Sequence, residues 1–315
     1  FSSDFRILQP VDPDKGNKRI LFDILNRGKA LALRNLNSAP DVLPADPPDP
    51  GNGFLMRQGY TVVWCGWQHD VPSVPGVLSI NIPDAVGPNG PIDGKIVVTF
   101  QNNVPAQAQL MSDRNHQSYP TNNMEDLDAV MTVQEHEDAP EETIPWDQWS
   151  FARLDDSRVV PDPKHVYMSA GFEPGKVYQV IYSTTGAPVV GLGLLATRDM
   201  ATFLRYGGAQ EDNPCAENIE RAYTFGVSQS GRFLRLFLYL GLNRDETGRT
   251  AFDGFMPHVG GGKRGEFNHR FAQPSSQASR STNSLFPFSD VAQTDPETGL
   301  TDGLLTRLSA QGALP

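Results

Sequence analysis

The stretch YTFGVSQSGRFLRLFLYLG, from Tyr223 to Gly241, decides the fold. Its first three residues favour a β-strand, and Gly226 begins a turn made of small residues. From Arg232 onward the residues are strongly apolar and have the spacing of a buried helix. The stretch therefore predicts a strand, a sharp corner and a helix, with Ser228 in the middle of the corner.

The corner is close to the nucleophile elbow pattern G-x-S-x-G, with Ser230 in place of the second glycine. A serine at such a corner has a strained backbone, so small residues are needed two positions away, and Gly226 and Ser230 meet that need. The backbone N–H of Gln229 is the expected first donor to an oxyanion. Ser230 is the rival nucleophile, but Arg232, two residues after it, is too bulky for an elbow. The alternative role for Ser228 is that of a helix-capping serine.

Composition excludes several classes of function. The chain has 315 residues, a formal net charge of −11 and a pI of about 5.0, so nucleic acid is not an expected partner. Cys65 and Cys215 have no CxxC spacing, which leaves one disulfide or two buried thiols. No metal-binding spacing and no phosphate-binding loop occur, so neither a metal nor a cofactor is predicted. No apolar run is long enough to span a membrane, and no cellular compartment is predicted.

Three portions of the chain differ in their sequence pattern. Residues 1–70 contain buried strands with a short helix between them, which is typical of parallel α/β architecture. Residues 71–175 contain short alternating strands separated by Pro, Gly and Asn turns, and predict a β-rich insertion. Residues 176–315 return to the α/β pattern, with a buried strand at Lys176–Thr184 and a helix within Gly191–Gly207. The expected fold class is α/β, with a mostly parallel sheet flanked by helices.

Eight stretches of the chain resemble the α/β-hydrolase superfamily. More narrowly, they resemble large bacterial proteins known as alpha/beta hydrolase domain-containing proteins, and together they cover nearly the whole chain. The stretches are FSSDFRILQPVDP, ILNRGK, GNGFLMRQGYTVVWCGW, AGFEPGKVYQVIY, GLGLLATRD, GVSQSGRFLR, FDGFMPHVGGGKRGEFNHRFAQPS and TDPETGLTDGLL. The resemblance implies an α/β-hydrolase-type fold with a β-rich insertion, and a serine hydrolase in which Ser228 is the nucleophile.

The position of the general base is less defined than that of the nucleophile. In the superfamily the acid and the histidine follow the nucleophile along the chain, and the relatives extend beyond both ends of this sequence. The resemblance therefore implies a fragment whose acid and histidine lie beyond Pro315, and a serine without its base is a poor nucleophile. His258 and His269, after the elbow, are candidate pocket residues, with a structural hydrogen-bonding role as the alternative. His69 follows an earlier strand and is a further candidate.

Two other groups of residues are candidates for contact with a substrate. The loop NRGK, from Asn26 to Lys29, follows the strand before the first helix and is where the superfamily has its second oxyanion donor. Its Gly28 would let the backbone approach a substrate, although a plain turn is the alternative. Arg264 and Arg270 either bind an acidic group of the substrate or form salt bridges on their loop.

The leading functional hypothesis is a carboxylic-ester hydrolase that acts on a small-molecule ester through an acyl-enzyme on Ser228. A non-catalytic binding protein on a hydrolase scaffold is the alternative, with Trp146 and Trp149 binding carbohydrate or another ligand. Those two tryptophans would otherwise cover the core of the β-rich portion. An acyltransferase or lyase would share the same serine.

Overall fold

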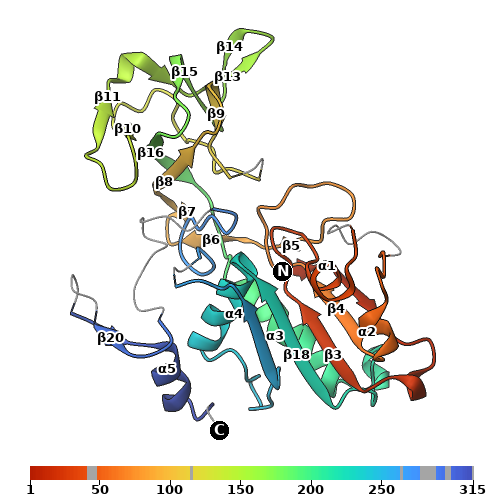
Figure 1. The fold of residues 1–315 in the computed structure, drawn as a ribbon. Coiled ribbons are helices and arrows are strands. Elements are labelled where there is room, and N and C mark those ends of the chain that lie inside the picture. Colours follow the sequence, from red (N-terminus) through yellow and green to blue (C-terminus); the bar gives the residue numbers. More distant parts are fainter. Residues whose placement is uncertain (41–47, 114–115, 263–264, 277–288, 295–298, 314–315) are drawn as a thin grey trace. The chain divides into compact units, whose positions relative to one another are not determined.

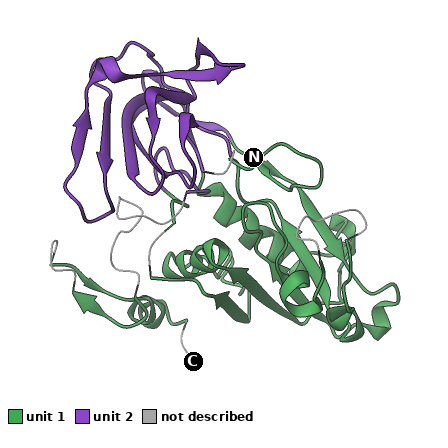
Figure 2. Cartoon of the chain, turned by 45° about the horizontal axis from the view of Figure 1, so that its top comes forward, with its two compact units in different colours: residues 1–82, 190–268, 281–315 green, residues 83–189, 269–280 purple. Residues whose placement is uncertain are grey.

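The computed structural model describes residues 1–315 except 41–47, 114–115, 263–264, 277–288, 295–298 and 314–315. The chain divides into two compact units, which Figure 2 shows in different colours. Unit 1 comprises residues 1–82, 190–268 and 281–315, and unit 2 comprises residues 83–189 and 269–280. The second unit is thus inserted into the first along the chain.

Unit 1 is built on a five-stranded sheet (Figure 1). Across the sheet the strands are β19 (Gly254–His258), β18 (Arg221–Val227), β3 (Arg19–Asp23), β4 (Thr61–Cys65) and β2 (Phe5–Leu8). The first four strands run parallel to one another, whereas β2 runs antiparallel to β4. The sheet is therefore mixed. The central strands are continuous apolar runs because both of their faces are buried.

Helices follow or precede the parallel strands. They are α1 (Ala32–Asn37), α2 (Phe54–Arg57), α3 (Leu192–Tyr206), α4 (Gln229–Tyr239) and α5 (Leu304–Ala310). The helix predicted within Gly191–Gly207 is confirmed as α3, and Gly207 ends it. Helix α4 packs on β18 and β19, and α3 packs on β18 and β4. Short 3-10 turns and two small strand pairs complete the unit: η1 (Pro13–Lys15), η3 (Ala209–Glu211), β1 (Ser2–Ser3) with β5 (Ile80–Asn81), and β20 (Gln293–Thr294) with β21 (Thr301–Asp302).

Unit 2 consists of antiparallel strands, and in its described residues no α-helix occurs. A four-stranded sheet has the order β11 (Glu142–Ile144), β10 (Val130–Gln134), β16 (Val177–Thr185), β8 (Asp93–Gln101). A three-stranded sheet has the order β12 (Trp149–Ser150), β15 (His165–Phe172), β9 (Ala106–Leu110). The smaller pairings are β13 (Ala152–Asp155) with β14 (Arg158–Pro161), and β17 (Ala187–Pro188) with β6 (Asp84–Gly87) and β7 (Gly90–Pro91); η2 (Trp146–Gln148) precedes β12.

The strand predicted at Lys176–Thr184 lies in unit 2, and not in the α/β sheet to which the sequence pattern assigned it. It forms β16, which pairs with β8 on one side and β10 on the other. A strand with both neighbours and buried side chains has the same residue pattern in either kind of sheet. The pattern alone could therefore not tell which sheet the strand joins.

Trp146 and Trp149 pack against each other inside unit 2. Their ring centroids are 4.4 Å apart, and Trp149 also packs against Phe151. Trp149 is buried in the core of the unit, and Trp146 is half-buried against that core. The two side chains therefore pack into and against the hydrophobic core of unit 2. This is the core-covering role expected as the alternative to ligand binding.

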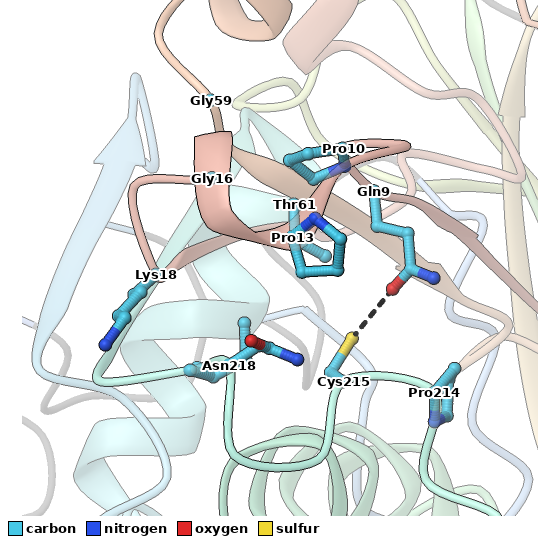
Figure 3. A pocket seen from close by; sticks show the side chains of 11 residues that line it. Gln9, Pro10, Pro13, Gly16, Lys18, Gly59, Thr61, Pro214, Cys215 and Asn218 are labelled. Atoms are coloured by element: carbon cyan, nitrogen blue, oxygen red, sulfur yellow. Dashed lines mark hydrogen bonds between the residues drawn. The ribbon is translucent and has the colours of Figure 1, made fainter.

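Both cysteines are buried and free. Cys215 lies beside a small pocket of about 30 Å³ at the end of the sheet where the parallel strands begin, and its Sγ is 3.5 Å from Oε1 of Gln9 (Figure 3). Cys65 ends β4, and its Sγ is 3.1 Å from the hydroxyl of Ser3. Burial raises the pKa of each thiol to about 11.

We expect both thiols to be unreactive in the folded protein, because the thiolate is the reactive species and burial disfavours it. At pH 8 a pKa near 11 in place of about 8.5 lowers the thiolate fraction on the order of a hundredfold. Titration with a chromogenic disulfide should give no rapid phase for native protein and two thiols per chain in urea. A thiol that titrates rapidly in the native protein would contradict the burial of that cysteine.

In the part of the chain that the structure describes, no helix combines the length and the apolar character needed to cross a membrane.

Candidate active site

Ser228 lies at the corner between β18 and α4, as the elbow pattern predicts. Its backbone has φ 54° and ψ −105°, a conformation that costs a residue with a side chain on the order of 1–3 kcal/mol. The N–H of Ser228 donates to the carbonyl of His258, and its carbonyl accepts the N–H of Arg232, both at 2.9 Å. Its side chain is exposed and makes no capping hydrogen bond to α4. The corner thus presents the hydroxyl outward from a backbone that is held on both sides.

Small residues make the corner possible. A Cβ on Gly226 would lie 2.6 Å from the carbonyl oxygen of Ser230, and a Cβ on Gly231 would lie 2.9 Å from Cα of Gly260. Ser230 is fully buried; its hydroxyl accepts the N–H of Val227 at 2.9 Å and donates to the Val227 carbonyl at 3.1 Å. The hydroxyl of Ser230 therefore satisfies the backbone of the elbow and is not presented to solvent.

The loop Asn26–Lys29 lies beside the elbow, at the carboxyl end of β3. Asn26 and Lys29 exchange two backbone hydrogen bonds, and Arg27 and Gly28 between them have φ 50° and 77°, so the loop is a tight two-residue turn. The side-chain amide of Asn26 donates to the carbonyl of Val227 at 2.6 Å. Gly28 is needed for its positive φ and for the close approach of Val77, whose Cγ1 would lie 2.6 Å from a Cβ there.

A buried chain of side-chain amides connects the elbow to that loop. Oε1 of Gln229 accepts the N–H of Arg27 at 3.0 Å, and Nε2 of Gln229 donates to Oε1 of Gln68 at 3.1 Å. Gln68 in turn donates to Asp70 at 2.6 Å. The sequence predicts only a backbone role for Gln229, and it predicts no role for Gln68, Asp70 or the side chain of Asn26. The available signal was their position, since Gln68 and Asn26 directly follow buried strands that end at the same edge of the sheet.

Asp23, the last residue of β3, is fully buried below this edge. Its Oδ2 accepts the N–H of Ala32 and the indole N–H of Trp64, both at 2.9 Å. Its Oδ1 is buried without a hydrogen-bond partner among the described residues. Burial raises the pKa of the carboxyl to about 7, although its hydrogen bonds oppose the shift.

The histidines named from the sequence lie in different places. His258 ends β19 next to the elbow and is exposed; its ring stacks over Phe225 with 6.3 Å between centroids. His69 is half-buried and follows β4 at the same edge of the sheet. His269 and Arg270 are exposed and belong to unit 2, and Arg264 lies outside the described residues. The described residues contain no group of three or more His, Cys, Asp or Glu side chains that could hold a metal ion.

The site therefore consists of a strained, exposed serine, a helix N-terminus behind it and a tight turn beside it, all at the carboxyl edge of the parallel strands. A family model described as alpha/beta hydrolase domain matches residues 111–304, which is more than half of the chain and includes β18, the elbow and α4. No curated protein and no solved structure matches the chain. The matched residues and the elbow geometry agree: the chain belongs to the alpha/beta hydrolase domain family.

Proposed function

We propose that the protein is a serine hydrolase of carboxylic esters, with Ser228 as its nucleophile. The observation that carries the proposal is the conformation of Ser228, which is strained, exposed and without a capping bond. A strained residue persists only where its surroundings hold it, and such residues cluster at active sites. The other serine of the motif, Ser230, has its hydroxyl bonded to Val227 and is buried.

The surroundings of Ser228 support the stabilisation of an oxyanion. The backbone amide of Gln229 is the first of α4, and the first amides of a helix have no acceptor within the helix. In this proposal it donates to the developing oxyanion, and the turn Asn26–Lys29 supplies the second donor. Because the amide of Arg27 already donates to Gln229, Gly28 is the residue of the turn that we assign to this role.

The reaction would proceed in two steps. Oγ of Ser228 attacks the carbonyl carbon of the ester while a histidine removes the hydroxyl proton. The carbon–oxygen bond to the alcohol then breaks, the histidine returns the proton to the leaving alcohol, and an acyl-serine remains. Water, deprotonated by the same histidine, attacks the acyl-serine and releases the carboxylic acid and the free serine.

Covalent labelling tests the nucleophile directly. Treatment of the full-length protein with a fluorophosphonate, followed by peptide mass spectrometry, should place one adduct on Ser228, since only an activated serine attacks the phosphorus centre. The Ser230→Ala variant should be labelled at the same position, and Ser228→Ala should not be labelled. Failure to find an adduct on Ser228 of the folded wild-type protein would refute the proposal.

The role of His258 is tested by its own substitution. We expect His258→Asn to lower the labelling rate less than tenfold, because its link to the elbow is made by its backbone carbonyl, which the variant keeps. Removing the general base of a catalytic triad costs about 10⁴-fold or more. A loss of that size, with unchanged circular dichroism, would identify His258 as the general base.

A further inference from the structure

Arg232 is placed one helical turn after Ser228. Its backbone N–H donates to the carbonyl of Ser228 at 2.9 Å, which is the first bond of the α4 ladder. Residues four apart lie on the same face of a helix, and helical side chains lean toward the N-terminus of their helix. By this geometry the side chain of Arg232 leans toward the turn that contains Ser228.

The guanidinium of Arg232 is buried and forms no ion pair with any residue that the structure describes. The residue is 6% exposed, and its Nη1 is buried with no hydrogen-bond partner in the part of the chain that the structure describes. Two other enclosed arginines of this unit form ion pairs: Arg198 with Asp199 and Glu246, and Arg205 with Asp253. Burial also lowers the pKa of Arg232, but an arginine stays charged in a protein.

A buried charge without a partner destabilises the fold, so binding of an anion beside it is energetically favourable. The N-terminus of α4 adds partial positive charge at the same place, and its first turn contains no acidic residue. Two independent features next to Ser228 thus favour a negative charge there. A carboxylate fits both, because its two oxygens match the planar guanidinium.

We propose that Arg232 forms a subsite for a carboxylate group of the substrate, so that the esters hydrolysed at Ser228 carry a free carboxylate. The subsite rests on the proposed function for its link to ester hydrolysis, although binding of a carboxylate can be measured without catalysis. It narrows the substrate class from esters in general to anionic esters.

Thermal unfolding of the full chain tests the subsite. In a Ser228→Ala background, which prevents turnover, monomethyl succinate should raise the Tm in a concentration-dependent manner, because a ligand that binds only the folded state stabilises it. Dimethyl succinate, which lacks the carboxylate, should give no comparable shift. The shift should be lost in Arg232→Met and retained in Arg19→Met, a matched control on an exposed residue at the opposite end of the sheet.

A second measurement separates the subsite from a structural role. Without ligand, Arg232→Met should unfold at a higher temperature than the parent protein, because the variant removes an unpaired buried charge and keeps a similar length of apolar side chain. An arginine that is paired within the fold would give a lower Tm when replaced. Arg232→Gln provides the same comparison with a polar side chain.

The inference is overturned if Arg232→Met lowers the Tm, if it keeps the response to monomethyl succinate, or if the two succinate esters act equally on the parent protein. The proposed function is refuted by a different result, namely the absence of a fluorophosphonate adduct on Ser228. The two proposals can therefore fail separately.

Discussion

Replacing Ser228 with alanine is expected to lower kcat for a 4-nitrophenyl ester by about 10⁴- to 10⁶-fold, the loss seen when a hydrolase loses its nucleophile. The strained backbone at φ 54° needs no particular side chain, so the variant should keep the fold. We expect the variant to hydrolyse the ester at a rate close to the uncatalysed rate in buffer, with an unchanged circular dichroism spectrum. A variant that retains more than a hundredth of the wild-type kcat would refute the assignment.

The matched control is Ser230→Ala, two residues away in the same motif. Among the described residues its hydroxyl bonds only to the backbone of Val227, so its removal should cost about 1 kcal/mol of stability and leave kcat within about tenfold. If Ser230→Ala abolished activity and Ser228→Ala did not, the two serines would have exchanged roles.

The largest expected effect on stability is the pH dependence caused by Asp23. Its pKa in the folded protein is about 7, against about 3.9 for an unfolded chain, so the folded state binds its proton more tightly. Stability from the protonated carboxyl is complete below pH 4 and is lost as the pH rises to 7. Three pKa units correspond to about 4 kcal/mol, as an order of magnitude.

The variant Asp23→Asn should remove this dependence. An asparagine oxygen can accept the same two N–H groups, from Ala32 and Trp64, and carries no charge at any pH. Urea unfolding should therefore show Asp23→Asn gaining stability relative to wild type between pH 5 and pH 8. The quantity to compare is the free energy of unfolding of the variant minus that of the wild type, measured at pH 5 and at pH 8. Any effect of asparagine on packing is the same at both pH values and cancels in this comparison. A difference that stays constant would contradict the raised pKa.

The elbow was predictable because it is local. Strand, corner and helix are encoded by consecutive residues between Tyr223 and Gly241, and the need for Gly226 follows from the crowding of a tight turn. Helix α3 was predictable for the same reason, since its apolar spacing and Gly207 lie within one segment. The sequence predicts a mostly parallel sheet, whereas the sheet is mixed because β2 pairs antiparallel with β4. This pairing joins segments far apart in the chain, so the local sequence pattern could not predict it.

Contacts between distant segments could not be read from the residues. The bond from Arg27 to Gln229 spans 202 positions, and that from Gln229 to Gln68 spans 161. Polar residues such as these look like solvent-exposed loop residues until the fold brings them together under the elbow. The charge state of Asp23 and the isolation of Arg232 also depend on burial, which is a property of the whole packed unit.

The sequence by itself thus determined where the corner is and which serine occupies it, because backbone propensity and steric size act between neighbours. Only the tertiary structure decided what surrounds that serine. Desolvation and hydrogen-bond geometry are set by segments that approach one another through folding, and they bring the turn Asn26–Lys29 beside the elbow and leave the charge of Arg232 without a partner in the described protein.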